Sequence, residues 1–341
     1  MMGTKPTLHE VAATAGVSLA SASRALTGRS ASPEMVRKVR TAAKRIGYLP
    51  DATARSLRLG GHRQVVFAVD DIGNPNYVQM LRAIEAELGE TTRISVSSTG
   101  RRPDQTVELV RMLSMGAGDG LIISPLRVTP ALRQAIADTV VPVVVIGTLH
   151  SDLGVDNVFV DSSVAVGMVV DHLVEIGRTR IGVINGPGNT NPGAARRAGF
   201  AAAVERHALA RTDALQITAA DFTVGAGVDA AEHLLAATLD SGIPIDATVC
   251  ANDLIAIGAI SAARRRGLRV PDDLAVTGID DTELAALYSP PLTSVSLQSE
   301  RRGGIAARML SERFADPSRP PRRETVDATL VIRASTIGET A

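Results

Sequence analysis

The sequence has a single cysteine and no long apolar run, and both absences exclude classes of protein. One cysteine, Cys250, cannot build an internal disulfide framework and is typical of a reducing compartment. The first residues lack the apolar core of a secretion signal, and no uninterrupted apolar stretch reaches the roughly 18 residues that a membrane-spanning helix needs. We therefore expect a protein that is neither exported nor membrane-embedded and that acts in the cytoplasm, associated with the nucleoid when bound to DNA.

The chain also lacks the signatures of common catalytic and metal sites. Its six histidines form no pair at metal-ligand spacing, and neither HExxH nor GxSxG occurs. The segment 186–189 (GPGN) lacks the lysine and the Ser/Thr of a phosphate-binding loop, so we interpret it as a turn. We expect no enzyme activity, no cofactor and no metal.

A formal net charge of zero hides two oppositely charged parts. Residues 1–63 hold 11 basic and 3 acidic residues, whereas the remainder holds 25 basic and 33 acidic residues. Basic side chains neutralise phosphates and release counterions when a protein binds DNA. The chain of 341 residues is also too long for one compact core. We expect a small DNA-binding head followed by an acidic body of two lobes.

The segment 7–26 (TLHEVAATAGVSLASASRAL) predicts two short helices joined by a tight turn. Thr7 and Glu10 have the spacing of a capping box, which starts the first helix. Gly16 stands where the chain leaves this helix, and Ser18 caps the second one. Several side chains of the second helix are small or polar enough to approach base edges: Leu19, Ala20, Ser21, Ser23 and Arg24. An ordinary helical hairpin is the alternative.

A third helix and a short connecting segment follow. Ser32 caps the third helix, and Pro33 takes its first position. Residues 49–62 contain a helical pattern that is too short to be stable alone. This segment is either a flexible linker or a hinge helix that orders only with a partner chain and DNA. We expect a helix-turn-helix domain at 1–48 and a hinge at 49–62.

From residue 63 onward, apolar strands alternate with amphipathic helices. This rhythm predicts two doubly wound parallel sheets of about five strands each. Ligands bind at the carboxyl ends of such strands. Polar residues stand at these ends: Asp70, Asp71, Asn74, Asn185, Asn252, Asp253, Asp280 and Asp281. We expect about half of them to cap the following helix instead, Asn74 and Asp253 above all.

In this order the parts resemble the LacI/GalR family of bacterial transcription regulators. The resemblance extends over essentially the whole chain and rests on EVAATAGVS, SRALTG, GYLPDATARSL, DIGNPNY, RRAGF, ANDLIAIGAI, GLRVPDDLAVTGIDD and PPLTSVSLQ. It implies an all-α helix-turn-helix head on a two-lobed α/β body like a periplasmic binding protein. The body at 63–341 would bind an effector and dimerise, with a first lobe at about 63–160 and 292–324 and a second at about 161–291 and 325–341.

The resemblance implies a repressor that binds a pseudo-palindromic operator as a homodimer, with the second helix in the major groove. Because the C-terminal segment has no apolar heptads, we expect a dimer and no larger assembly. The implied DNA contacts are Thr7, Ser18, Leu19, Ala20, Ser21, Ser23 and Arg24 in the head and Ala54 and Leu57 in the hinge. Leu57 would wedge a base step in the minor groove and bend the duplex.

The resemblance also implies an effector site between the lobes. Its residues would be Asn76, Tyr77, Asp161, Arg197, Phe222, Asn252 and Asp280. Helix capping is the alternative role of Asp161. An aspartate and an asparagine opposite an arginine favour a sugar or polyol over a purine. Asn76 and Gly147-Thr148 depart from the family pattern, in which an aromatic and an acidic residue often stand at these places.

Effector binding would close or rotate the lobes and so change the spacing of the two hinges in the dimer. Two other classes share the two-lobed scaffold. A solute-binding protein of a transporter would need an export signal and no basic head. An enzyme would need a nucleophile, a base and an orienting group placed together, and no motif here supplies them.

Overall fold

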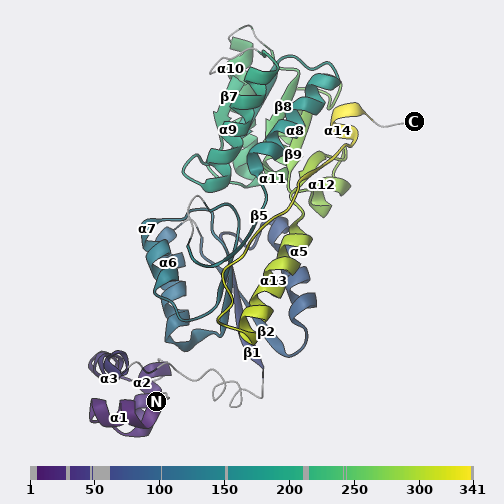
Figure 1. The fold of residues 1–341 in the computed structure, drawn as a ribbon. Helices are drawn as coiled ribbons and strands as arrows, with labels where there is room; N and C mark the ends of the chain where they lie inside the picture. Colours follow the sequence, from purple (N-terminus) through teal and green to yellow (C-terminus); the bar gives the residue numbers. More distant parts are fainter. Residues whose placement is uncertain are drawn as a thin grey trace.

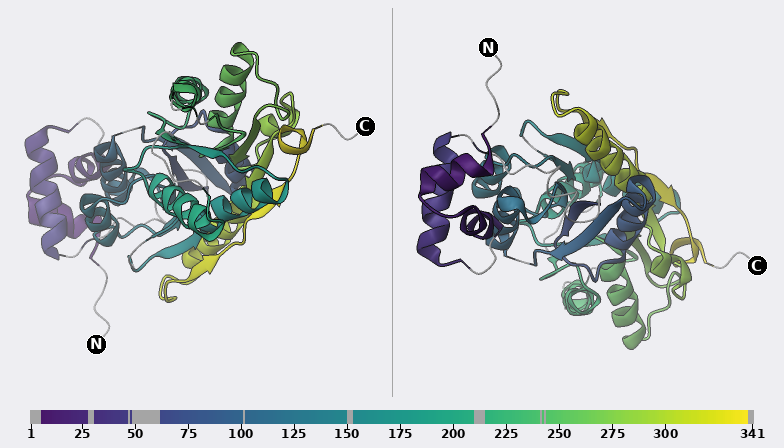
Figure 2. Two further views of the ribbon diagram at one scale, coloured as in Figure 1. Left: turned by 90° about the horizontal axis from the view of Figure 1, so that it is seen from above. Right: turned by 90° about the horizontal axis from the view of Figure 1, so that it is seen from below.

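The computed structural model describes residues 6–27, 31–46, 48, 62–100, 102–149, 153–209, 215–240, 242 and 244–338. Figure 1 shows a small helical head and two α/β lobes, and Figure 2 shows the head gathered to one side of the lobes. The predicted hinge at 49–62 lies outside the described residues except for His62. Among the helices within these ranges, none is both long and apolar enough to span a membrane.

The head consists of the three predicted helices, α1 (Leu8–Ala15), α2 (Leu19–Thr27) and α3 (Pro33–Ile46). The capping box is confirmed, because the Glu10 amide donates to Thr7 Oγ1 (3.3 Å) and the Thr7 amide donates to Glu10 Oε2 (2.6 Å). Gly16 adopts a φ of 59°, and the Ser21 amide donates to Ser18 Oγ (3.1 Å). A core of small side chains, centred on Val11, Ala22, Ala25 and Val39, holds the helices together.

The first lobe is built on a six-stranded parallel sheet in the order β11-β5-β4-β3-β1-β2. Its strands are β1 (Arg63–Val69), β2 (Thr92–Ser98), β3 (Gly120–Ser124), β4 (Val143–Ile146), β5 (Asp156–Phe159) and β11 (Arg323–Thr325). Alternate side chains of β1 enter separate cores: Phe67 packs with α5 (Pro75–Leu88) and α13 (Ser299–Ala315), and Val66 packs with α6 (Pro103–Met112), η1 (Leu113–Ala117) and α7 (Pro130–Ala137).

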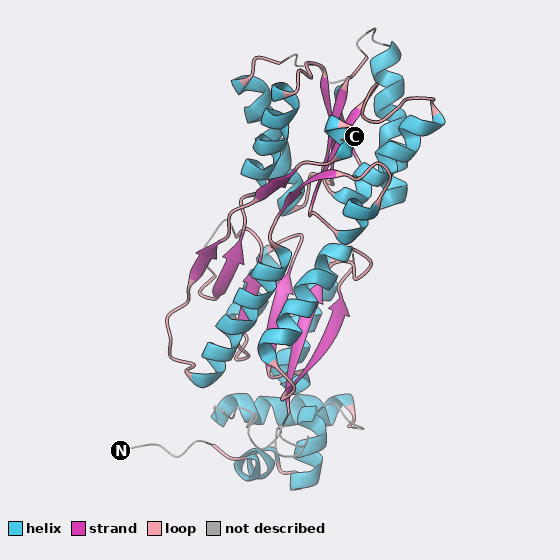
Figure 3. Cartoon of the chain, turned by 90° about the vertical axis from the view of Figure 1, so that its right-hand side faces the viewer, coloured by secondary structure: helices cyan, strands magenta, loops and turns pink. Residues whose placement is uncertain are grey.

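The second lobe repeats this design in the order β12-β10-β9-β8-β6-β7. Its strands are β6 (Ile181–Asn185), β7 (Gln216–Thr218), β8 (Ala247–Cys250), β9 (Ala275–Ile279), β10 (Thr293–Ser296) and the antiparallel β12 (Thr329–Val331). One core receives α8 (Ser162–Glu175) and α9 (Asn191–Arg206), and the other receives α10 (Val224–Asp240) and α11 (Asp253–Arg265). The short helices α12 (Glu283–Leu287) and α14 (Ala334–Ile337) complete the lobe. Figure 3 shows both layered lobes.

The chain passes between the lobes three times, and one crossing differs from the prediction. β10 pairs with β9, so residues 293–296 belong to the second lobe and the chain crosses after Ser296, whereas the prediction placed the crossing at 292. Each sheet also has six strands, where about five were expected. The returning segments supply short edge strands, β11 and β12, whose three residues leave no clear periodic signal.

Glycine allows α10 and α11 to pack at close range. A Cβ at Gly227 would stand 2.6 Å from the Ile255 carbonyl oxygen, whereas a Cβ at Gly225 would meet nothing within 4 Å. We expect Gly227→Ala to lower the free energy of unfolding by about 1–3 kcal/mol, because the helices must move apart. Gly225→Ala should leave stability unchanged or raise it by up to about 1 kcal/mol. Urea unfolding of both variants tests this, and equal effects would contradict it.

Candidate functional site

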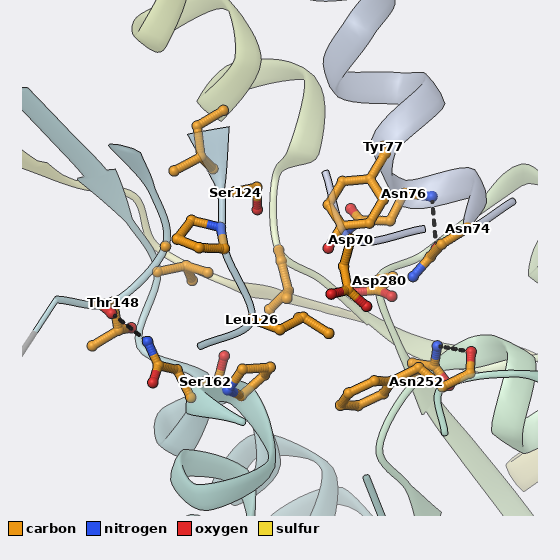
Figure 4. Close-up of a pocket in the computed structure, with 18 of the residues that line it drawn as sticks. Asp70, Asn74, Asn76, Tyr77, Ser124, Leu126, Thr148, Ser162, Asn252 and Asp280 are labelled. Atoms are coloured by element: carbon orange, nitrogen blue, oxygen red, sulfur yellow. Dashed lines mark hydrogen bonds between the residues drawn. The ribbon is translucent and has the colours of Figure 1, made fainter. Parts of the chain in front are cut away.

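A pocket lies between the lobes, at the carboxyl ends of both sheets, where a doubly wound fold is expected to bind its ligand (Figure 4). Its empty volume is about 910 Å³, which includes solvent space at the open mouth. The first lobe contributes Asp70, Asn76, Tyr77, Ser124 and Thr148, and the second contributes Asn191, Arg196, Phe222, Asn252 and Asp280. Arg302 of α13 lines the pocket as well. A small ligand here would touch both lobes at once.

The structure brings together five of the seven residues predicted for the effector site. These five line the pocket: Asn76, Tyr77, Phe222, Asn252 and Asp280. Asp161 and Arg197 are not among its lining residues. Asp161 instead caps α8, because its Oδ1 accepts from the Ser163 amide (2.8 Å) and the Ser163 hydroxyl (2.6 Å). The hydrogen bond from the Ser163 hydroxyl lowers the pKa of Asp161. Asp161 therefore has the geometry of a helix cap, the alternative role that the sequence suggested.

The arginine that α9 contributes to the pocket is Arg196, one residue before the one that we predicted. Arg196 is 7% exposed, its Nη2 lies 3.9 Å from Asp280 Oδ1, and its Nη1 donates to the Ala251 carbonyl. Arg197 is exposed and donates to Thr218 Oγ1 (3.2 Å). Successive residues of a helix point about 100° apart, so one of the pair faces the pocket and the other faces away.

The cap of α11 is Asn252 and not the Asp253 that we expected, although Asn252 also lines the pocket. Asn252 caps α11 by accepting from the Ile255 amide (2.9 Å), and its Nδ2 donates to the Phe222 carbonyl (3.2 Å). Asp253 is buried behind the pocket and accepts from the Thr282 amide (2.8 Å), the Thr282 hydroxyl (2.9 Å) and the Ser294 hydroxyl (2.5 Å). Burial, with a smaller contribution from Asp280, raises the pKa of Asp253 to about 7. Asn74 does cap α5 as predicted.

Asp280 is the buried carboxylate of the pocket lining. It is 4% exposed and has a φ of 114°, a conformation rare outside glycine. Burial raises its pKa to about 6, although Arg196 and Arg302 oppose this shift. In Figure 4 Asp70 and Tyr77 of the first lobe lie near it. Burial, Asp70 and Asp280 together raise the pKa of Tyr77. Strained, buried polar groups of this kind gather at ligand sites.

Arg302 was missed by sequence reasoning. It is 5% exposed, and its Nη2 donates to Ser299 Oγ (3.2 Å), whose hydroxyl donates to Asn76 Oδ1. Burial lowers the pKa of Arg302 to about 10. The surrounding letters SERRGG are typical of an exposed charged helix. Apolar residues nevertheless recur three, four, seven and eight positions after Arg302, which places it on the buried face of α13, whereas Arg301 lies off that face.

Hydrogen bonds join the lobes at one side of the pocket. The Asn191 amide donates to the Leu126 carbonyl (2.8 Å), and Asn191 Nδ2 donates to the Thr148 carbonyl (3.2 Å). Arg127 donates to Asn189 Oδ1 (3.1 Å). The predicted turn at 186–189 therefore leads directly into a connection between the lobes.

We expect Asn191→Ala to shift the lobes toward an open arrangement. Losing one side-chain hydrogen bond costs about 1 kcal/mol, or roughly a fivefold change in the ratio of closed to open molecules. The measurement is the radius of gyration in solution by X-ray scattering, which should increase. Gln216→Ala on the exposed edge strand β7 is the control and should change nothing. An unchanged radius for Asn191→Ala would show that this bond does not hold the lobes together.

The head presents the predicted reading surface on α2. Leu19, Ala20 and Arg24 are exposed, whereas Ser21 and Ser23 are half-buried. Ser18 and Thr7 serve as helix caps. The hinge residues predicted to contact DNA, Ala54 and Leu57, lie outside the described residues. Among the described residues, no group of three or more His, Cys, Asp or Glu side chains could hold a metal ion.

Comparison with known proteins assigns the head and part of the body to known domain families. Residues 7–51 match the family described as bacterial regulatory proteins, lacI family, and residues 170–336 match the periplasmic binding protein-like domain. The HTH-type transcriptional regulator CelR of Thermobifida fusca is 31% identical over 342 residues, which cover 97% of this chain and 98% of that protein.

Two solved structures extend the likeness over the whole fold. The transcriptional regulator CelR in complex with cellobiose is 29% identical, with a TM-score of 0.72, covering 97% of this chain and all of that one. The lac repressor dimer bound to operator and the anti-inducer ONPF is 25% identical, with a TM-score of 0.70, covering 98% of this chain and all of that one. The chain belongs to the LacI family of bacterial regulatory proteins, and it is a DNA-binding regulator of transcription.

Proposed function

We propose that this chain is a repressor that binds a pseudo-palindromic operator as a homodimer and that a small carbohydrate in the interlobe pocket controls this binding. The observation that carries the proposal is the pocket itself. Buried Asp280 and Asn252 at the ends of the second lobe's strands and Arg196 of α9 line the same pocket as Asn76 and Tyr77 of the first lobe. The proposal assigns the protein no catalytic reaction and places it in the cytoplasm, on the nucleoid.

The relatives support both halves of the proposal. One solved relative holds cellobiose, and another is a dimer on its operator. Polar groups suited to vicinal hydroxyls line this pocket, since a carboxylate accepts hydrogen bonds and guanidinium and amide groups donate them. Phe222 supplies an apolar wall.

For the DNA contact, we propose that α2 enters the major groove. Leu19 and Ala20 then offer apolar contacts, for example to a thymine methyl group, and Arg24 contacts a base edge or a phosphate. Ser18, Ser21, Ser23 and Thr7 position the helix. The minor-groove role of Ala54 and Leu57 rests on the family resemblance alone.

The switch follows from the geometry of the lobes. A ligand that bonds to both lobes favours the arrangement in which they are close together, and so changes the spacing of the two heads in a dimer. Ligand and DNA then affect each other's affinity equally, by about 1–3 kcal/mol in such systems.

The test begins with selection of DNA from a random library by the full-length chain, which should recover an inverted repeat. Arg24→Ala should weaken binding to the selected site about five- to hundredfold, since one arginine contact to a base is worth about 1–3 kcal/mol. Arg93→Ala on β2 of the first lobe is the control. Carbohydrates are then added to the complex. Recovery of no repeat, or an operator affinity that no carbohydrate changes, would refute the corresponding half of the proposal.

A further inference from the structure

The deepest part of the pocket holds more positive than negative charge. Arg196 and Arg302 are both more than nine-tenths buried, and Asp280 is the only carboxylate among the described lining residues with comparable burial. Three further carboxylates line the pocket: Asp70 and Asp221 are half-buried, and Asp71 is exposed. Asp71 and Asp221 accept from the nearby amides of Gly73 and Phe222. Among the described lining residues, the most buried charged groups are therefore two cations and one anion, whereas the less buried ones are all carboxylates.

The two arginines retain hydrogen-bonding capacity. Within the described part of the chain, Nε of Arg196 and Nε of Arg302 are buried without a hydrogen-bond partner. Arg196 lies at 3.9 Å from Asp280, which is long for an ion pair, and no described carboxylate lies within 4.0 Å of the Arg302 guanidinium. Buried donors without acceptors are costly and usually mark the place of a missing group.

The two guanidinium groups are near enough to interact with each other and with Asp280. Each affects the ionisation of Asp280, and Arg196 helps to lower the pKa of Arg302 by repulsion. An oxyanion placed between the two guanidinium groups would offset their mutual repulsion and accept hydrogen bonds from the two unpartnered Nε–H groups. Guanidinium groups bind carboxylates and phosphates in this way, through parallel N–H donors.

We propose that the ligand of this pocket is a hydroxylated molecule with an anionic oxygen group, a carboxylate or a phosphate, which Arg302 and Arg196 bind together. The inference rests on the proposed function and narrows its ligand from carbohydrates in general to acidic ones. Asp280 and the second N–H of the Asn252 side-chain amide remain available to the hydroxyl groups of the same molecule.

The experiment measures thermal stability and binding heat of the full-length chain with matched probes at constant ionic strength. These are D-glucose, D-glucuronate, D-glucose 6-phosphate, inorganic phosphate and sulfate. We expect at least one anionic probe to raise the Tm more than glucose does, and Arg302→Gln to weaken its binding at least tenfold. Arg301→Gln removes the same charge from an exposed neighbour and should bind as the wild type does.

A second measurement separates a ligand-binding role from a structural one. If Arg302 served only as a counter-ion within the fold, Arg302→Gln would lower the Tm of the ligand-free chain. Because burial disfavours the Arg302 charge, we expect a ligand-free Tm equal to or above that of the wild type. A lower Tm would overturn the inference. So would anion binding that survives the substitution, or the absence of stabilisation by every anionic probe.

Failure of this inference can be told apart from failure of the proposed function. If neutral carbohydrates change operator binding and Arg302→Gln leaves that response intact, the anionic ligand is wrong and the regulated repressor stands. If operator binding responds to no small ligand of either charge, the proposed function itself fails.

Discussion

Asp280→Asn is expected to weaken effector binding about ten- to hundredfold and to abolish the effector's control of operator binding at working concentrations. A hydrogen bond that includes a charged group is worth about 1.5–3 kcal/mol, and Asp280 is the buried carboxylate that can accept from the ligand. The head is untouched, so operator affinity without effector should stay near that of the wild type.

The same substitution should not destabilise the ligand-free chain. The raised pKa of Asp280 means that the fold accommodates the neutral acid better than the carboxylate, despite both arginines. Asparagine resembles the neutral acid in shape and carries no charge. We therefore expect an equal or higher free energy of unfolding at pH 7.5, measured in urea.

Loss of binding together with retained stability would identify Asp280 as a residue kept for its ligand. Asp272→Asn, on the exposed surface of the same lobe, is the matched control. If the effector still acted on Asp280→Asn at the same concentration, the pocket would not be the effector site. If stability fell by several kcal/mol, the carboxylate would be needed for the fold.

The elements that follow local rules were predictable from the sequence. The capping box of Thr7 and Glu10, the left-handed Gly16 and the serine cap at Ser18 are local signals, and each is confirmed. The alternation of strands and helices likewise predicted both lobes. The sequence did not predict β11 and β12, because each has only three residues and forms by pairing with a strand from a distant part of the chain.

The sequence predicted where in the fold the site lies, but it did not always predict which residue contributes to it. Strand ends located Asn252 and Asp280, whereas the RAGF motif led to Arg197 in place of Arg196. The helical spacing of the buried residues of α9 would have pointed to Arg196. Gly193, Gly199, Phe200 and Ala203 form the buried face of α9, and Arg196 lies on that face at the same spacing. Arg302 carried a similar signal, since apolar residues recur three, four, seven and eight positions after it and mark the buried face of α13.

Stability is expected to depend on pH through Asp253. Its pKa is about 7 in the folded chain and near 3.8 when the side chain is exposed, so between these values the native state binds a proton that the unfolded state does not. Its contribution to stability is therefore greatest at acid pH and is lost as the pH rises through 7. One pKa unit corresponds to 1.36 kcal/mol, so the contribution of Asp253 should fall by on the order of 2–4 kcal/mol between pH 5 and 8.

Asp253→Asn isolates this contribution. The amide can accept from Thr282 and donate to Ser294, whose hydroxyl can reverse its role, so the local bonds are retained. His172, whose pKa is lowered by burial, changes stability in the opposite direction over part of the range, but it does so equally in both proteins. The wild-type free energy of unfolding should therefore decline more steeply from pH 5 to 8 than that of the variant. Glu283→Gln at the exposed start of α12 should keep the wild-type slope. Parallel curves for Asp253→Asn and the wild type would mean that Asp253 is ionised across this range.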